Sequence, residues 1–283
     1  MSASKAVLIT GCSTGIGRAT AERMASAGYA VYATARRIES IEDLEAKGCR
    51  TLALDVTDED SMSAAVTVVE EAEGAVGALV NNAGYSQSGA VESVSLDGIR
   101  VQFETNVFGL IRMSQLVLPK MRRQGWGRIV NVGSMGGKVT FPGGGIYHAT
   151  KYAVEAISDA MRFELSGFGV RVALIEPGLI QTEFAAAAVG ALNTGTTGEQ
   201  DGPYAHFNQA VGAATAGAYE GPAARLGGGP DAVAKAIEKA IGSRRPKARY
   251  PVTPSAWIVM GQRALCTDRM WDAVVGTQFP KPS

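Results

Sequence analysis

The sequence contains little cysteine and little histidine. Among 283 residues there are three cysteines and only two histidines, His148 and His206. Cys12, Cys49 and Cys266 form no close-spaced pair, so they offer neither a disulfide framework nor a metal knuckle. Two histidines far apart in sequence argue against a His-rich metal site. We therefore expect a cytoplasmic protein with reduced thiols and no bound metal.

An excess of charge and long apolar runs are also missing. The 27 Lys and Arg residues balance the 27 Asp and Glu residues, whereas proteins that bind nucleic acids usually carry a basic excess. We therefore expect no nucleic-acid partner. No apolar run approaches the roughly 20 residues that span a bilayer, and residues 1–5 are short and polar, unlike a signal peptide. The sequence predicts no membrane span.

Short β-branched apolar runs alternate with segments of helical spacing. In the segment from Lys151, for example, apolar residues recur at steps of three or four, while Glu155, Asp159 and Arg162 lie off that stripe. This alternation predicts a doubly wound, Rossmann-type α/β fold with a parallel sheet, in a single domain over residues 1–283. The expected strands are residues 6–10, 30–34, 51–55, 78–81, 128–132 and 170–175.

The segment that follows residue 181 has a different composition. Residues 185–229 are rich in Gly, Ala and Thr and poor in periodic apolar residues. An interdomain linker is one interpretation, but too little chain follows for a second domain. A long loop inside a compact domain is more often a lid, so we predict a mobile substrate lid at residues 181–230. A helix at 231–241, capped by Asp231, and a strand at 249–252 follow, and the tail from Trp257 shows no clear period.

The lid segment has few charges and no basic cluster. A strand end in a doubly wound sheet borders the ligand crevice, so the lid is expected to begin beside the reactive end of a ligand. Its composition predicts a small apolar substrate rather than an anionic one. The larger side chains of the segment are Phe184, Leu192, Tyr204, Phe207, Tyr219 and Leu226.

A glycine-rich turn joins the first expected strand to the first expected helix. Its glycines allow the backbone to approach a pyrophosphate, and the helix that follows presents its unpaired N–H groups and positive dipole end to that anion. The position between strand and helix is the context in which a glycine cluster indicates a dinucleotide site. The residues of this loop that we expect to contact the cofactor are Gly11, Ser13, Thr14, Gly15, Ile16 and Gly17.

The end of the second expected strand selects between the two dinucleotides. An acid at this position binds the ribose 2′-hydroxyl of NAD, whereas arginine accommodates the 2′-phosphate of NADP. Here the sequence has Arg36 and Arg37, with no acid before Glu39. A guanidinium can pair with a phosphate through two hydrogen bonds. We predict NADP(H) as the preferred cofactor, with Arg36 rather than Arg37 as the chosen contact and NAD(H) as the weaker alternative.

Further motifs follow in a fixed order. They are Asn81-Asn82-Ala83-Gly84, Asn106 before Val-Phe-Gly, Ser134, a Tyr147-x-x-x-Lys151 pair thirteen residues after that serine, and Pro177-Gly178. Together with the glycine loop, these motifs resemble the short-chain dehydrogenase/reductase family over residues 5–182. The stretches 10–13, 31–34, 54–57 and 106–109 resemble most the subgroup of 17-beta-hydroxysteroid and retinol dehydrogenases.

The spacing of Tyr147 and Lys151 has a chemical consequence. Residues four apart on a helix lie on one face, so the lysine cation can favour the phenolate of a tyrosine whose ordinary pKa is about 10. Ser134 can hydrogen-bond the substrate oxygen. These residues suit a hydride transfer between a nicotinamide and a carbonyl or alcohol carbon, with Tyr147 as general acid and base. An exposed, inconsequential Tyr–Lys pair is the alternative if these residues are taken alone.

The resemblance implies roles for the remaining positions. It implies that Lys151 binds the nicotinamide ribose and that Asn106 holds a water in a proton relay. It also implies an NADP-linked enzyme for apolar alcohols and ketones, which pairs as a homodimer or homotetramer through helices near residues 99–121 and from 147. The implied cofactor contacts are Asp55 and Val56 at the adenine, Asn82, Ala83 and Gly84 at the adenosine, and Pro177, Gly178, Ile180 and Thr182 at the nicotinamide.

Two other functions fit parts of the pattern. A dinucleotide sensor or scaffold would keep the fold and lose the chemistry, but such proteins usually lose the tyrosine or the lysine, and both are present here. A sugar-nucleotide epimerase or dehydratase shares the Tyr-x-x-x-Lys pair, but those chains are typically longer and have a differently spaced glycine loop. NADPH consumption with a panel of ketones and aldehydes distinguishes the enzyme from the sensor.

Overall fold

The computed structural model describes residues 3–183, 190 and 202–281. In this part of the chain, seven parallel strands form one sheet in the order β3-β2-β1-β4-β5-β6-β7, which confirms the predicted doubly wound fold. The strands are β1 Val7–Ile9, β2 Val31–Ala35, β3 Cys49–Ala53, β4 Ala78–Asn81, β5 Gly127–Val132, β6 Val170–Pro177 and β7 Arg249–Val252.

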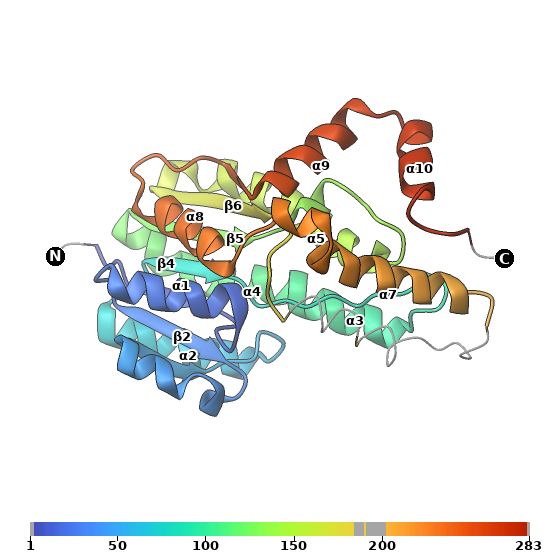
Figure 1. The fold of residues 1–283 in the computed structure, drawn as a ribbon. Helices are drawn as coiled ribbons and strands as arrows, with labels where there is room; N and C mark the ends of the chain where they lie inside the picture. Colours follow the sequence, from blue (N-terminus) through green and yellow to red (C-terminus); the bar gives the residue numbers. More distant parts are fainter. Residues whose placement is uncertain (1–2, 184–189, 191–201, 282–283) are drawn as a thin grey trace.

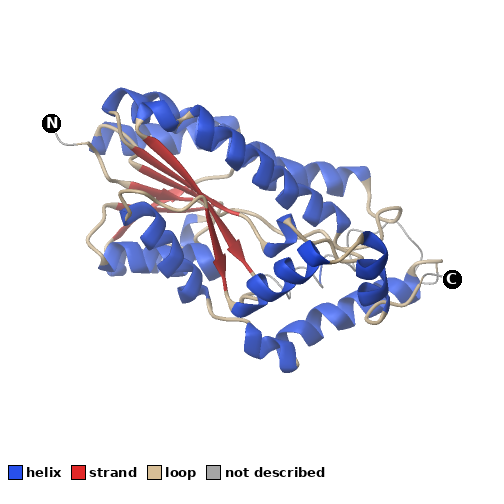
Figure 2. Ribbon diagram, turned by 90° about the horizontal axis from the view of Figure 1, so that it is seen from above, coloured by secondary structure: helices blue, strands red, loops and turns tan. Residues whose placement is uncertain are grey.

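Helices cover both faces of this sheet (Figures 1 and 2). This arrangement buries the central strands on both sides, which is why their sequences are continuous apolar runs rather than alternating ones. In the described residues the α-helices with assigned bounds are α1 Gly15–Ser26, α2 Glu59–Glu73, α3 Leu96–Phe103, α4 Gly109–Gln124, α5 Gly145–Glu164, α7 Ala205–Glu220, α8 Pro230–Gly242, α9 Pro254–Leu265 and α10 Asp268–Gly276.

Two apolar cores hold the helices to the sheet. On one face, α1 and α8 pack together; α1 buries Met24 against β1 and β2, and α8 buries Ile237 against β5, β6 and β7. On the other face, α2 and α4 bury Val69, Met113 and Val117 against β1, β4 and β5. Each fully buried side chain of this size contributes roughly 1.5–3 kcal/mol. The two cores fix the strand ends, and the loops that leave those ends carry the site.

The expected lid contains a helix, which the sequence analysis did not predict. Residues 205–220 form α7, and its buried side chains Phe207 and Val211 pack against Ala90. The interpretation of residues 185–229 as a long irregular loop is therefore wrong for this stretch. Alanine, which is abundant here, has the highest helix propensity, and two apolar residues four apart are enough to anchor one face of a helix.

The structure differs from the expectation at two further places. The tail from Trp257 forms helices α9 and α10, although its apolar residues show no clear period. The cap of α8 is Gly229 rather than Asp231, because Pro230 takes the first helical position. Asp231 lies in the first turn, where its carboxylate meets the positive end of the helix dipole.

Within residues 3–183, 190 and 202–281, no helix combines the length and the apolar character that crossing a membrane requires.

Candidate active site

Ser134, Tyr147 and Lys151 meet at the carboxyl end of the sheet. Ser134 follows β5, and its Oγ accepts a hydrogen bond of 3.0 Å from the backbone N–H of Gly136. Lys151 lies one helical turn after Tyr147 on α5, with its Nζ 5.8 Å from the centre of the tyrosine ring. Its ammonium donates to the carbonyl of Val132 at 2.9 Å, so α5 is joined to β5 beside the serine.

Burial governs the ionisation of these groups. It raises the pKa of Tyr147 to about 12, while a hydrogen bond with Ser134 acts in the opposite direction. Burial also lowers the pKa of Lys151 to about 8. Removing a phenolate from water costs more than the Ser134 contact returns, so burial outweighs that hydrogen bond. Tyr147 is therefore a protonated phenol at neutral pH.

Asn106 lies in a π-helical turn, Glu104–Phe108, between α3 and α4. Such turns are frequent at functional sites. Its side chain is buried, donates to the carbonyl of Tyr85 at 2.9 Å and to Thr150 Oγ1 at 3.1 Å, and accepts from the N–H of Tyr85 at 3.1 Å. Both amide hydrogens are thus used to join the loop at residue 85 to the catalytic helix.

His148 holds the serine loop against α5. Its ring Nδ1 lies 3.0 Å from the carbonyl of Gly136, and a Cβ on Gly136 or Gly144 would lie within 3 Å of the ring. Burial lowers the pKa of the imidazole. The ring is therefore neutral at pH 7 and has a packing role.

The glycine loop is compact enough to exclude any side chain at Gly17. A Cβ there would lie 2.1 Å from the carbonyl oxygen of Gly11 and 2.6 Å from Asn82 Nδ2. Asn82 fastens the loop by donating to the carbonyls of Thr10 and Gly11 at 2.9 Å each. At the start of α1, Thr14 makes no side-chain cap and the first turn has no acid. The backbone N–H groups of this first turn can therefore bind an anion. Ser13 precedes the turn in the sequence, and Ile16 belongs to it.

The predicted adenosine contacts lie around this loop. The N–H of Cys12 donates to the carbonyl of Thr34 at 2.7 Å, which joins the loop to the end of β2. Arg36 follows that strand, is exposed, and forms no ion pair with the described residues. Asp55 accepts hydrogen bonds from the backbone and hydroxyl of Thr57. Val56 is buried against Gly109, and Ala83 and Gly84 follow Asn82 towards Asn106.

The chain beyond β6 runs towards the glycine loop. A Cβ on Gly178 would lie 2.3 Å from Ser255 Oγ, so this glycine allows β6 and the start of α9 to approach closely. Ile180 is buried and pairs with Gly228. Thr182 lies against the loop, since a Cβ on Gly15 would be 3.3 Å from its methyl group. Pro177, Gly178, Ile180 and Thr182 thus extend from the serine side of the site to the phosphate side.

The expected lid side chains divide into two groups. Tyr204 and Phe207 anchor α7, and the hydroxyl of Tyr204 donates to Glu92 at 2.7 Å. Tyr219, near the other end of α7, lies close enough to Tyr147 to contribute to the raised pKa of its phenol. Leu226 is partly exposed in the turn Pro222–Leu226. Phe184 and Leu192 lie outside the described residues.

Comparison with known proteins gives a consistent result. The short chain dehydrogenase profile matches residues 5–191. The chain is 36% identical over 272 residues to an Escherichia coli K12 protein named uncharacterized oxidoreductase YbbO, covering 96% of this chain and 94% of that protein. It is 33% identical to the NADPH-dependent 3-dehydrocapnine reductase of Ornithobacterium rhinotracheale, covering 94% of each. The crystal structure of a short-chain dehydrogenase from Streptomyces avermitilis superimposes with a TM-score of 0.79 at 33% identity, covering 93% of each chain.

The protein belongs to the short chain dehydrogenase family. It is an oxidoreductase, and its fold and family are those of proteins that bind a nicotinamide cofactor.

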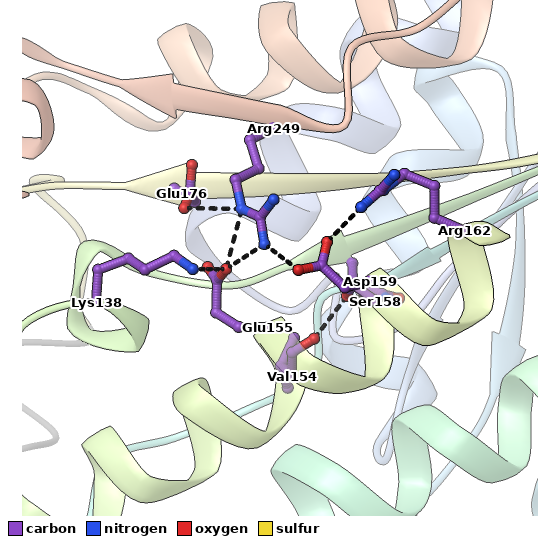
Figure 3. Close-up of polar contacts among 9 residues, drawn as sticks. Lys138, Val154, Glu155, Ser158, Asp159, Arg162, Glu176 and Arg249 are labelled. Carbon is purple, nitrogen blue, oxygen red and sulfur yellow. Dashed lines mark hydrogen bonds and ion pairs between the residues drawn. The ribbon is translucent and has the colours of Figure 1, made fainter.

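This short-chain dehydrogenase has a buried charged network that the sequence analysis missed (Figure 3). Glu155, one turn beyond Lys151, accepts from Lys138 at 2.7 Å and from Arg249 at 2.9 Å. Arg249 also reaches Asp159 at 2.7 Å and lies 3.7 Å from Glu176. The network therefore connects the catalytic helix, the loop after Ser134 and strands β6 and β7.

The two buried glutamates of this network disfavour each other's charge. Glu176 is 2% exposed, and burial together with the neighbouring Glu155 raises its pKa to about 7. Glu155 looked like a solvated residue in the sequence because it lies off the apolar stripe of α5. The sequence holds no signal for its burial, because Arg249, its partner, is 94 residues away.

We predict that Glu176 makes stability depend on pH. In the unfolded chain a glutamate has a pKa of about 4.3, well below the folded value of about 7 for Glu176. Between these two pKa values the folded state retains a proton on Glu176 that the unfolded state has lost. The contribution of Glu176 to the free energy of unfolding is therefore fully present below the pKa of the unfolded chain and is lost as pH rises through about 7. Glu176→Gln removes this loss. The melting temperature of Glu176→Gln minus that of wild type should increase by at least about 2 °C from pH 5 to pH 8.

Thermal unfolding followed by circular dichroism measures this difference. Glu164→Gln, at the exposed end of α5, is the matched control and should show the same pH profile as wild type. A Glu176→Gln profile parallel to wild type would contradict the assignment.

A second prediction concerns Tyr147. Tyr147→Phe removes only the transferable proton, so kcat should fall by about 10²–10⁴, as expected for loss of a general acid. Cofactor affinity should be retained. Tyr152→Phe, one helical turn away on the exposed side of α5, should keep full turnover. Steady-state kinetics and cofactor titration of both variants check this; substantial activity in Tyr147→Phe would rule out the assignment.

Proposed function

We propose that the protein is an NADP(H)-dependent oxidoreductase that reduces the carbonyl group of a small apolar substrate, with Tyr147 as proton donor. The convergence of Ser134, Tyr147 and Lys151 at the carboxyl end of the sheet, beside a glycine loop suited to a pyrophosphate, supports this function most strongly. When bound, the nicotinamide supplies the hydride to the carbonyl carbon.

Each residue of the site has a distinct task in this proposal. Ser134, held by the N–H of Gly136, hydrogen-bonds the carbonyl oxygen and orients it towards Tyr147. Tyr147 gives its proton to that oxygen as negative charge develops there. A phenol that is protonated at neutral pH suits the donor role. Lys151 stabilises the phenolate that remains and holds the nicotinamide ribose, while Asn106 fixes the position of the helix.

The residues around the glycine loop fit a dinucleotide. The glycine loop leaves no room for a side chain at Gly17, and the uncapped first turn of α1 offers N–H groups to the pyrophosphate. We assign the adenosine end to Asp55, Val56, Asn82, Ala83 and Gly84. The relative from Ornithobacterium rhinotracheale is named as NADPH-dependent, which supports a preference for NADP(H). We assign the 2′-phosphate to Arg36, whose guanidinium has no acid in the described part of the chain to compete for it.

The lid assigned to residues 181–230 supports an apolar substrate. Tyr204 and Phe207 fasten the beginning of α7, so those two aromatic side chains are used for anchoring. Tyr219, which lies near Tyr147, is left to border the substrate. We propose that this end of the lid closes over the substrate and excludes water.

We also propose that two or four copies assemble. Exposed apolar side chains occur on the helices through which the family resemblance implies pairing. They include Val101 on α3, Phe108 at the start of α4, and Tyr152 and Phe163 on α5, the last of which is 82% exposed. Large exposed apolar groups on neighbouring helices are typical of surfaces that another copy covers.

We predict that the unmodified protein binds NADPH more tightly than NADH and that Arg36→Asp abolishes or reverses the preference. Losing a charge-assisted contact to the phosphate costs roughly 1.5–3 kcal/mol, which is between one and two decades in affinity. Arg37→Asp makes the same change of charge one residue away and should retain most of the preference for NADPH over NADH. Fluorescence titration with both cofactors measures this; equal affinity of the wild type for the two would refute the assignment.

We predict that catalytic efficiency rises with the apolar size of the carbonyl substrate. Each buried methylene contributes about 0.8 kcal/mol, or roughly a fourfold gain until the pocket is full. NADPH consumption with 2-butanone, 2-hexanone and 2-octanone should show this rise. The matched 2-oxo acid, 2-oxooctanoate, should be a poor substrate. A better rate with the acid would overturn the apolar assignment, and no turnover with any carbonyl despite tight cofactor binding would favour a dinucleotide sensor.

A further inference from the structure

A cavity of about 350 Å³ lies at the amino ends of the strands, away from the candidate active site. Tyr29 precedes β2, Arg128 is the second residue of β5, and Arg171 is the second residue of β6. Ser134 and Pro177 lie at the opposite ends of the same two strands. The lining is formed by Lys5, Tyr29, Trp126, Arg128, Gly169, Arg171, Ile241, Gly242, Ser243 and Arg244.

Four cations line this cavity and no acid does. They are Lys5, Arg128, Arg171 and Arg244, from four segments far apart in the sequence. In the part of the chain that the structure describes, none of the four forms an ion pair. By contrast, Arg23 on the neighbouring helix α1 pairs with Glu238 at 2.5 Å. A chain with no net charge therefore places an uncompensated positive cluster at this end of its sheet.

Arg128 is the buried member of the cluster. It is 6% exposed, and its guanidinium lies 4.8 Å from the centre of the Trp126 ring. Its two terminal nitrogens donate to the carbonyls of Gly127 at 2.9 Å and Ser243 at 3.0 Å, whereas its Nε has no hydrogen-bond partner among the described residues. Neutral carbonyls orient a guanidinium but leave its charge uncompensated, and a buried charge without a counter-ion is costly.

The neighbours of Arg128 increase this cost. Burial lowers the pKa of its guanidinium, and the positive charge of Arg171 lowers it further. Both effects act against the charged form, and an anion placed between the two arginines would cancel them. The hydroxyl of Tyr29 supplies a neutral donor on the same side, since a Cβ on Gly242 would lie 3.5 Å from it.

We propose that this cavity binds a small phosphate-bearing anion. Several converging cations favour a group with more than one negative charge, and arginine matches the geometry of phosphate oxygens with paired donors. The cavity is larger than a single phosphate group, so it has room for a pyrophosphate or a phosphomonoester. The site is separate from the glycine loop: along β5, Arg128 lies six residues from Ser134, which is about 20 Å of strand.

Calorimetric titration with inorganic pyrophosphate tests the site, with NADP⁺ present so that the glycine loop is filled. One molecule should bind per chain. Arg171→Gln and Arg244→Gln should each weaken binding about threefold to tenfold. Arg245→Gln changes the net charge equally but lies outside the cavity, so it is the matched control and should bind as wild type does. Both substituted arginines are exposed, so folding should be unaffected.

Fluorescence gives a second readout that depends on this cavity alone. Pyrophosphate should change the emission of Trp126, and the change should be lost in Trp126→Phe while Trp257 and Trp271 remain. Adenosine monophosphate and citrate, in parallel titrations, distinguish a phosphomonoester from a general preference for polyanions. Absence of pyrophosphate binding, equal weakening by Arg245→Gln, or binding of citrate alone would each overturn the proposal. None of these outcomes depends on whether the protein reduces a carbonyl.

Discussion

The ammonium of Lys151 is carried into the interior of the protein, where the carbonyl of Val132 at the end of β5 accepts its hydrogen bond. Ser134 follows two residues later, and Tyr147 lies one turn earlier on the same helix. That single bond therefore fixes the register between the strand that presents the serine and the helix that presents the tyrosine. Once the register is fixed, Ser134 can contact Tyr147, and Asn106 can reach Thr150 from the neighbouring π-helical turn.

Lys151 and Glu155 lie four residues apart on the same face of α5, and both are buried. The ammonium of Lys151 contacts the carbonyl of Val132, whereas the carboxylate of Glu155, one turn further along, contacts Lys138 and Arg249. A buried ion pair is weak evidence for stability, because desolvation offsets much of the attraction. Its value here is geometric: the carboxylate of Glu155 ties α5 to β7 and to the loop beyond the serine. Glu176 immediately precedes Pro177, so the network also borders the segment that leads to the proposed nicotinamide contacts.

The two ends of the sheet carry different electrostatic environments. At the carboxyl ends, backbone N–H groups and one exposed arginine are arranged around a glycine cradle that admits no side chain. At the amino ends, four cations meet without an acid. Because parallel strands place all their amino ends together, residues scattered from 5 to 244 converge there. A balanced composition thus does not imply a balanced surface, and net charge alone cannot exclude an anionic ligand.

The sequence by itself determined the fold class, the glycine loop, most strand positions and the family, because these depend on local spacing: β-branched runs, glycines at a strand–helix junction, and a tyrosine four residues before a lysine. Only the tertiary structure decided the rest. Helix α7 needed Ala90 as a surface for Phe207, and α10 is held by the burial of Trp271 and Val275 against Val139, more than 130 residues away. The burial of Glu155 depends on an arginine 94 residues away, and the raised pKa of Tyr147 depends on desolvation. Burial and charge are set by residues distant in the chain, so no local pattern can encode them.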